Sequence, residues 1–254
     1  MEFIHDEALD QKAKALQSPL KHETKKPISI VRIERDANAF HGLRAVKLGD
    51  VDFPLVLGPK ESVILDFGEH CVGYLQYSLT HFPDSIVDSP AMLKFTFGEF
   101  PLEIEQQPDA YKGVLGSGWL QNETRNIAIT PYDGALDRRY SFRYVKIERV
   151  DSALFPVKLT SVIADCVSAV KLCEAKLFSI PDETLNKIYF ASIKTLKECE
   201  QDVFEDGPKR DRRLWIGDLR LQALTDNITF SNADLVKRCI YLFAAHRAEH
   251  GFVS

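Results

Sequence analysis

The chain has 254 residues, of which 45% are hydrophobic and 27% charged, with a formal net charge of −5 and a pI of about 5.8. This composition is typical of a globular protein with a core large enough for one large domain or two smaller ones. There is neither a basic stripe nor an apolar run of the ~20 residues that cross a bilayer. We therefore expect no nucleic-acid partner and no membrane insertion.

The cysteines and the amino-terminus favour a cytoplasmic location. Five cysteines are scattered without a C-x-x-C pair, which argues for a reducing compartment and against a disulfide framework or a zinc site. Residues 1–7 are acidic and lack the basic-then-apolar order of a signal peptide. No pattern predicts a cofactor or a bound metal. His246 and His250 stand four residues apart, but no glutamate follows His246 as in a zinc-binding helix, so a solvated helix end is the better interpretation.

Residues 1–26 form a polar lead-in with a weak helical pattern, and a period of two begins at Pro27. Alternation of apolar and polar residues predicts strands with one face on a core and one in water. Several such strands, separated by turn-forming residues, predict an antiparallel β-sandwich over residues 27–176. The expected inward-facing residues are Leu75, Tyr77, Leu79, Leu93, Phe95, Phe97, Ile127, Ile129, Tyr140, Phe142, Tyr144, Val157, Leu159, Ser161 and Ile163.

A helical period replaces the alternation near Cys173, and three amphipathic helices are expected within residues 177–254. The first is expected to be capped by Ser179, and the third by Ser231 or Asn232. The second should follow Asp218. The residues that it should bury are Leu221, Leu224 and Ile228.

These helices carry wide apolar faces and need partners that the sequence does not supply before Ser254. Either they pack back on the sandwich, or they begin a larger helical domain that is cut short. In the second case, we expect an exposed apolar patch and self-association through it. The residues expected in the patch are Leu185, Ile188, Ile193, Leu224, Ile240 and Phe243.

The segment 204–218, between the first two helices, combines three aspartates, three arginines and a tryptophan. A charged surface loop is the ordinary interpretation of such a segment. However, Trp215 stands between Leu214 and Ile216, and an indole is costly to leave in water. Carboxylates, guanidiniums and an indole are also what a sugar pocket needs: acids bind hydroxyls, arginine fixes the acid, and the ring packs against sugar C–H groups.

This segment reads D-G-P-K-R-D-R-R-L-W-I-G-D and resembles D-x-P-x-R-D-E-R-x-G-W-x-G-D, the signature of the α-L-rhamnosidases. The resemblance covers roughly residues 60–254, because other family motifs occur in the same order. Leu65-Asp66-Phe67-Gly68 with Val72-Gly73-Tyr74, Phe142-Arg143-Tyr144-Val145, Leu185-Asn186-Lys187-Ile188-Tyr189 and Gly251-Phe252-Val253 are each similar to a family segment. The resemblance implies an α+β multidomain protein, in which a β-sandwich precedes the first helices of an incomplete (α/α)6 barrel.

The resemblance also implies roles for the residues of the signature. The family's general acid is the glutamate of R-D-E-R, and this chain is one residue shorter there. If the segment is aligned backward from Trp215, Asp211 falls at the position of the acid. If it is aligned forward from Asp206, Arg212 falls there, and arginine cannot donate a proton. We prefer the first alignment because Trp215 and Asp218 anchor it. Asp206 and Asp218 would then hold sugar hydroxyls, Arg210 would orient the acid, and Trp215 would pack on the sugar. Trp119, in a glycine-rich loop, is a further candidate for substrate contact.

The expected function is therefore inverting hydrolysis of terminal α-L-rhamnose on a glycoside or oligosaccharide. An inverting mechanism needs a second carboxylate as base, and Asp226, Asp234 and Glu249 sit on ordinary helical faces. We accordingly expect the 254-residue chain to be inactive alone. The alternative is a non-catalytic carbohydrate-binding or interaction module that keeps the β-sandwich.

Overall fold

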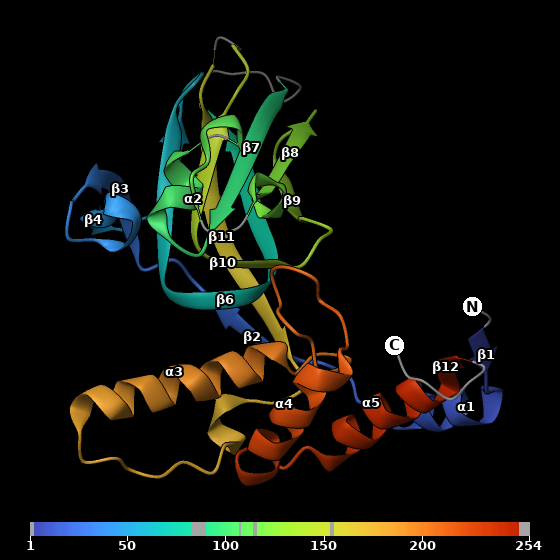
Figure 1. Cartoon of the computed structure of the whole chain (residues 1–254). Helices are drawn as coiled ribbons and strands as arrows, with labels where there is room; N and C mark the ends of the chain where they lie inside the picture. Colours follow the sequence, from blue (N-terminus) through green and yellow to red (C-terminus); the bar gives the residue numbers. More distant parts are fainter. Residues whose placement is uncertain (1–2, 83–89, 107, 114–115, 153–154, 249–254) are drawn as a thin grey trace. The chain divides into compact units, whose positions relative to one another are not determined.

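The structure is a computed structural model, and it describes residues 3–82, 90–106, 108–113, 116–152 and 155–248 (Figure 1). The chain divides into two compact units. One, the sandwich unit, comprises residues 23–166. The other, the helical unit, combines residues 1–22 with residues 167–254. The sequence analysis did not anticipate that the amino-terminal residues fold with the helices.

The sandwich unit is built from antiparallel strands, as the alternating pattern predicted (Figure 1). The longest strand, β6, pairs with β3, β9, β10 and β11, so it connects most of the sheet. One short helix, α2 (Pro101–Glu105), and 3-10 turns at Phe40–Gly42, Pro108–Ala110 and Ser117–Trp119 lie between strands. The strands are β2 (Lys21–Lys25), β3 (Ser29–Arg35), β4 (Leu43–Asp50), β5 (Leu55–Leu57), β6 (Ser62–His81), β7 (Ala91–Gly98), β8 (Gln121–Ile127), β9 (Tyr132–Ala135), β10 (Tyr140–Arg149) and β11 (Val157–Ser168).

The sandwich core is rich in aromatic side chains. Phe97 of β7 stacks on Tyr140 of β10 with ring centroids 3.9 Å apart, and it meets Phe142 edge to face at 5.1 Å. Leu75, Tyr77, Leu79, Leu93 and Phe95 are all buried, which confirms the predicted inward faces of β6 and β7. Burial of each such side chain is worth about 1.5–3 kcal/mol, so this core stabilises the unit without the helices.

Two register shifts correct the predicted faces. A shift between Leu159 and Ser161 in β11 reverses the alternation, so that Val162 and Ala164 are buried instead of Ser161 and Ile163. A second shift, between Phe142 and Tyr144 in β10, sends Tyr144 into a smaller cluster with Val31 and Ile104. Ile129 lies beyond the end of β8 and is exposed. A bulge has no signature in a simple period of two, which is why the pattern misplaced these residues.

Two of the family-like motifs meet in the sandwich. The guanidinium of Arg143 donates to both carboxylate oxygens of Asp66, through Nε and Nη2, each at 2.9 Å. Asp66 also accepts a hydrogen bond from the backbone N–H of Gly68 at 2.7 Å. Gly68 has a φ of 76°, a backbone conformation that favours glycine. The D-F-G and F-R-Y motifs therefore form one structural contact.

The helical unit contains the three predicted helices, although two begin at other residues than expected. Helix α3 (Glu183–Cys199) is capped by Asp182, which accepts from Leu185 N at 2.8 Å; the predicted cap, Ser179, is wrong because the first intrahelical bond starts at Asp182. Helix α4 (Ile216–Ile228) begins before Asp218, which lies in its first turn. Helix α5 (Ala233–Ala245) is capped by Asn232, as predicted. A 3-10 turn spans Leu172–Glu174.

The helical core is small, and α4 faces it with an unexpected side. Leu219 is buried, whereas Leu221, Leu224 and Ile228 are 59–65% exposed, so the predicted buried face of α4 is wrong for this chain. Of the residues expected in an exposed patch, Ile193 and Phe243 are buried instead, and Leu185, Ile188, Leu224 and Ile240 are exposed. The core consists of Leu196, Phe204, Leu219, Leu235, Cys239 and Phe243.

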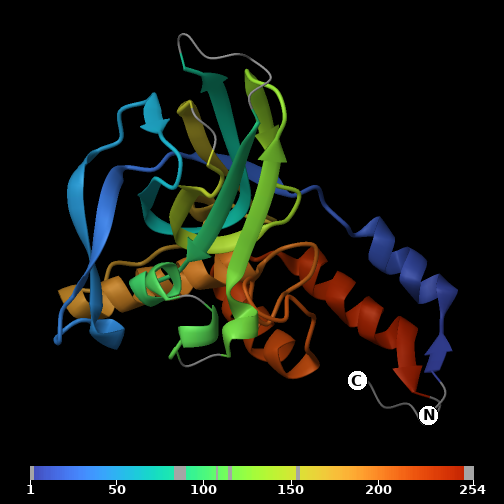
Figure 2. The same ribbon diagram turned by 90° about the horizontal axis from the view of Figure 1, so that it is seen from above.

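The amino-terminal segment packs against α5 (Figure 2). Helix α1 (Glu7–Ala15) buries Ala13 completely, and the backbone oxygen of Ala13 accepts a hydrogen bond of 2.7 Å from Arg238 of α5. Strand β1 (Phe3–His5) pairs antiparallel with β12 (His246–Ala248), which follows α5 directly. Among the described residues, no helix has the length and apolar character needed to cross a bilayer.

Candidate functional site

The signature segment connects α3 to α4 and is closed by a contact between its two ends. Asp206 N donates to Arg213 O at 2.9 Å, and Arg213 N donates back to Asp206 Oδ1 at 3.0 Å. Inside this closure, Arg212 N bonds Gly207 O, and Arg212 has a φ of 53°. The Asp206 carboxylate therefore helps to fix the loop that carries Arg210 and Asp211.

A cleft of about 560 Å³ lies beside this loop, between α3 and α4. Asp206 lines it at one end. Its walls otherwise combine small and hydroxyl side chains of both helices with the apolar Ile188 and Leu221. Gln222, which also lines the cleft, donates to Glu205 O at 2.7 Å and so attaches α4 to the loop. The size suits one sugar residue, and hydroxyl groups beside apolar surface are typical of carbohydrate sites.

The other signature residues do not line this cleft. Arg210 is exposed, and its Nε lies 3.7 Å from Asp211 Oδ1, a loose ion pair. The orienting role expected of Arg210 stays a prediction. Trp215 is 43% exposed at the N-cap of α4, and Asp218 is exposed in the first turn of the helix. The surface position of Trp215 leaves its ring available for contact rather than committed to the core.

Trp119 belongs to the sandwich unit, in the 3-10 turn Ser117–Trp119. Its ring is partly buried, and its backbone N–H bonds Gly116 O at 3.1 Å. Since it lies in the other unit, its contact with a substrate stays a prediction.

The sequence analysis missed a buried pair of carboxyl groups at the junction of the three helices. Glu200, the C-cap of α3, is completely buried, and Asp226, near the end of α4, is 1% exposed. Glu200 Oε1 and Asp226 Oδ1 are both buried without a hydrogen-bond partner among the described residues, so one proton held by the pair would satisfy both oxygens. Asn232 Nδ2 donates to Glu200 at 3.3 Å and Asn232 N to Asp226 at 2.8 Å. The pair therefore ties the ends of α3 and α4 to the cap of α5.

Burial raises the pKa of both carboxyls. Desolvation, then the charge of Asp226, raises the pKa of Glu200 to about 9. Desolvation also raises the pKa of Asp226, against the opposing effects of the Asn232 backbone, Glu200 and Lys176. The interpretation of Asp226 as lying on an ordinary helical face is wrong. The missed signal is its spacing from Leu219 and Ala223, which places all three on the buried face of α4.

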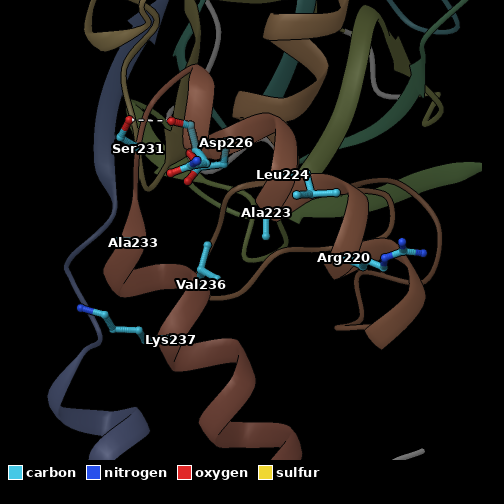
Figure 3. A pocket seen from close by; sticks show the side chains of 9 residues that line it. Arg220, Ala223, Leu224, Asp226, Ser231, Ala233, Val236 and Lys237 are labelled. Atoms are coloured by element: carbon cyan, nitrogen blue, oxygen red, sulfur yellow. Dashed lines mark hydrogen bonds between the residues drawn. The ribbon is translucent and has the colours of Figure 1, made fainter.

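Asp226 also lines a second hollow of about 560 Å³, between α4 and α5 (Figure 3). Its walls are mainly apolar, and Leu224 and Val236 lie between Arg220 and Lys237 in the view of Figure 3. Of the remaining carboxylates considered as a base, Asp234 is exposed and pairs with Lys237 at 3.4 Å, and Glu249 lies outside the described residues.

A serine, a histidine and a glutamate meet in the sandwich unit without forming a catalytic relay. Ser141 Oγ lies 3.0 Å from His70 Nε2, and Glu99 Oε1 lies 2.9 Å from the same nitrogen. A relay needs the nucleophile and the orienting carboxylate on different nitrogens of the histidine ring, whereas Ser141 and Glu99 are on the same one. The neighbouring Cys71 is buried in the core. This cluster is therefore structural.

Comparison with known families assigns the chain to a family. A model described as the glycosyl hydrolase family 78 alpha-rhamnosidase N-terminal domain matches residues 27–166. A second, described as the bacterial alpha-L-rhamnosidase 6 hairpin glycosidase domain, matches residues 174–254. The chain belongs to the family 78 α-L-rhamnosidases. The family predicted from the ordered motifs is thereby confirmed.

Solved structures agree with this assignment. A rhamnosidase from Klebsiella oxytoca, solved with rhamnose bound, is 39% identical over 100% of this chain, with a TM-score of 0.92. This chain covers 50% of that protein, so it spans about half the length of this relative. A family 78 rhamnosidase of Bacillus sp. GL1 shares the fold at 21% identity, with a TM-score of 0.62 over 78% of this chain and 20% of its own. No curated protein sequence matches the chain.

Proposed function

We propose that this chain forms part of an inverting glycoside hydrolase that releases terminal α-L-rhamnose from a glycoside or oligosaccharide. The observation that carries the proposal is the 39% identity, over the whole chain, to a rhamnosidase solved with rhamnose bound. The loop geometry supports it, because Asp206, Arg210 and Asp211 are held on one closed segment beside a cleft of sugar size.

Asp211 is the proposed general acid. In an inverting mechanism, an acid protonates the leaving oxygen while a second carboxylate activates water on the opposite face of the sugar. The proximity of Arg210 to Asp211, with 3.7 Å between Nε and Oδ1, supports an orienting role for the arginine. The position of Arg212 at positive φ supports a structural role for that residue, which cannot act as an acid.

The binding roles follow from position. Asp206 lines the cleft, so its carboxylate is the proposed acceptor for a sugar hydroxyl, with Asp218 as a second one. Trp215, exposed before α4, is the proposed platform for the sugar's C–H face. Trp119 of the sandwich unit is proposed as a further contact.

We propose that the general base lies outside this chain, in helices that complete an (α/α)6 barrel, and that the 254 residues alone are inactive. Two features support this. Asp226 is already committed to Glu200, and Asp234 to Lys237. The related Klebsiella protein also contains about as much chain again. A cytoplasmic location remains part of the proposal, and the scattered spacing of the five cysteines supports it.

The proposal is tested with a fusion in which this chain replaces the matched half of the Klebsiella rhamnosidase. The fusion should hydrolyse an aryl α-L-rhamnoside, and NMR should show the β-anomer of rhamnose as the first product. The isolated chain should show no turnover, because water activation needs the missing base. Turnover by the isolated chain would mean that it contains its own base.

A folded fusion without activity that still binds rhamnose would favour the alternative, a non-catalytic carbohydrate-binding module. Retention of the anomeric configuration would reject the inverting mechanism while leaving the substrate class in place.

A further inference from the structure

His5, Asp10 and His246 form a cluster at the end of the helical unit where the amino-terminal segment meets α5. His5 and His246 lie directly opposite each other in the β1–β12 pair, and Asp10 lies on α1, which follows β1 (Figure 2). One ligand atom from each of the three side chains lies within 4.8 Å of the other two. The sequence analysis weighed His246 only with His250, so His5 and Asp10 are new partners for it.

We propose that this cluster binds a divalent transition-metal ion such as Zn²⁺. Two imidazoles and one carboxylate are a ligand set that suits zinc, nickel, cobalt and copper, whereas magnesium and calcium prefer oxygen ligands throughout. Three protein ligands leave a fourth position of a tetrahedral ion for water. The inference concerns a site that plays no part in the proposed glycosidase chemistry.

The geometry requires a small adjustment. The two imidazole rings are stacked, with centroids 4.7 Å apart and planes 11° from parallel. Ligand atoms around tetrahedral zinc lie ~3.3 Å apart, so separations within 4.8 Å must contract by up to ~1.5 Å. Both histidines are exposed, so their rings can turn without disturbing the core.

The charge of the cluster also suits a cation. Asp10 brings a carboxylate to the two imidazoles. Lys14 Nζ lies 2.8 Å from Asp10 Oδ2 and occupies the place of a cation on that oxygen. An ion bound by the two imidazoles would share or displace this ammonium.

Binding would join β1, α1 and β12 at one ion. The described contacts of this segment include the short β1–β12 pair, the bond of 2.9 Å from Asp6 N to Ala245 O, and the Arg238–Ala13 bond. A metal held by β1, α1 and β12 together should therefore lower the frequency with which the amino-terminal segment detaches from α5.

The test is titration of the 254-residue chain with Zn²⁺ at pH 8, where neutral imidazole is available, followed by calorimetry. We expect one ion per chain. His5→Ala, His246→Ala and Asp10→Asn should each weaken binding ~10-fold or more, since each removes one of three ligands. His22→Ala removes an exposed histidine elsewhere in the unit and should leave affinity within about twofold. Circular dichroism at 222 nm checks that each variant is folded.

Two further variants test whether the ion is bound at this cluster and not elsewhere on the chain. Lys14→Gln should tighten binding several-fold, because the competing ammonium is gone, and a loss of folding cannot produce that result. Cys173→Ser removes the exposed thiol, which could itself hold zinc, and should change nothing. Absence of binding, binding that survives His5→Ala, or binding lost in Cys173→Ser would each overturn the proposal.

Discussion

The sandwich unit and the helical unit bury their apolar side chains to different extents. In the sandwich, β6, β7, β10 and β11 share one core in which large side chains such as Phe95, Phe97 and Phe142 are fully covered. The helical unit has a much smaller core, and α3, α4 and α5 expose large residues such as Ile188, Leu221 and Ile240. Two sheet faces can cover each other within one unit, whereas a short series of helices leaves their outer stripes without a partner.

This difference sets what each unit can do alone. The sandwich is stabilised by burial within itself. The helical unit depends on specific polar contacts at its helix ends, above all the Glu200–Asp226 pair with Asn232. The loop with Asp206 and Asp211 starts from this less complete unit, so the proposed catalytic residues sit where the described packing is thinnest.

The largest expected effect comes from deleting a core ring of the sandwich. Phe142→Ala should lower the free energy of unfolding of the sandwich by about 3–5 kcal/mol, because the ring is fully buried against Phe97 and Phe67. The matched change Phe190→Ala on α3, where the ring is 40% exposed, should cost the helical unit less than ~1 kcal/mol.

Urea denaturation can follow each unit separately, because the chain has one tryptophan in each. Trp215→Phe leaves Trp119 as the fluorescent reporter of the sandwich, and Trp119→Phe leaves Trp215 for the helical unit. Separate reporters are needed since a chain with two units does not unfold in one step. Equal losses from the two phenylalanine substitutions would refute the contrast between the cores.

The next effect is a pH dependence confined to the helical unit. Glu200 keeps its proton in the folded state up to a pKa of about 9, against an ordinary value of 4.5. The folded state therefore binds more protons than the unfolded state between these values, and stability falls as the pH rises, by at most ~1.4 kcal/mol per pH unit. Between pH 7.5 and 9, above the usual titration of histidine, urea denaturation followed at 222 nm should show this decline.

Glu200→Gln should remove most of that decline. The amide does not ionise, and its N–H can replace the shared proton toward Asp226. Glu183→Gln, at an exposed position in the first turn of α3, is the control and should leave the decline unchanged. A decline of the same size in Glu200→Gln would show that the carboxyl pair is not its cause.

A smaller effect on stability, but a clear one on association, is expected at the exposed stripe of α4. Leu221→Gln with Leu224→Gln should change the free energy of unfolding by about 0.5 kcal/mol or less per site, because both side chains are more than 60% exposed. Sedimentation velocity should show that the unaltered chain self-associates and that the double variant does so less. Leu48→Gln, on an exposed face of β4, should leave association as it was. A monomeric unaltered chain would contradict this account of the helical faces.

The sequence predicted more about the sandwich than about the helices, for physical reasons. Alternation determines which side of a strand is buried. It failed where a bulge changed the register, as between Leu159 and Ser161, and beyond the end of a strand, as at Ile129. Which face of a helix is buried depends on the elements that pack against it. In α4 the face with Leu221 and Leu224 is the more apolar of the two faces, yet the face with Leu219 and Asp226 packs against the core.

Of the candidate site, the motif located the segment, whereas its closure by Asp206 and Arg213 has no sequence signature, and the roles of Arg210 and Asp211 stay predictions. The Glu200–Asp226 pair could not be predicted, because two carboxyl groups far apart in sequence share one proton only when the fold removes both from water. The His5–His246 contact likewise depends on a strand pairing between the two ends of the chain.

The proposed role of Asp211 is tested most directly in the active fusion with two substrates, one with a good leaving group and one that needs protonation. Asp211→Asn should reduce kcat/KM steeply for the poorly activated rhamnoside and far less for the activated one, since only protonation of the leaving oxygen is lost. Asp206→Asn is the matched control and should affect both substrates alike, as loss of a hydroxyl contact would. Equal damage to both substrates by Asp211→Asn would contradict the account, and would make Asp211 a binding or structural carboxylate.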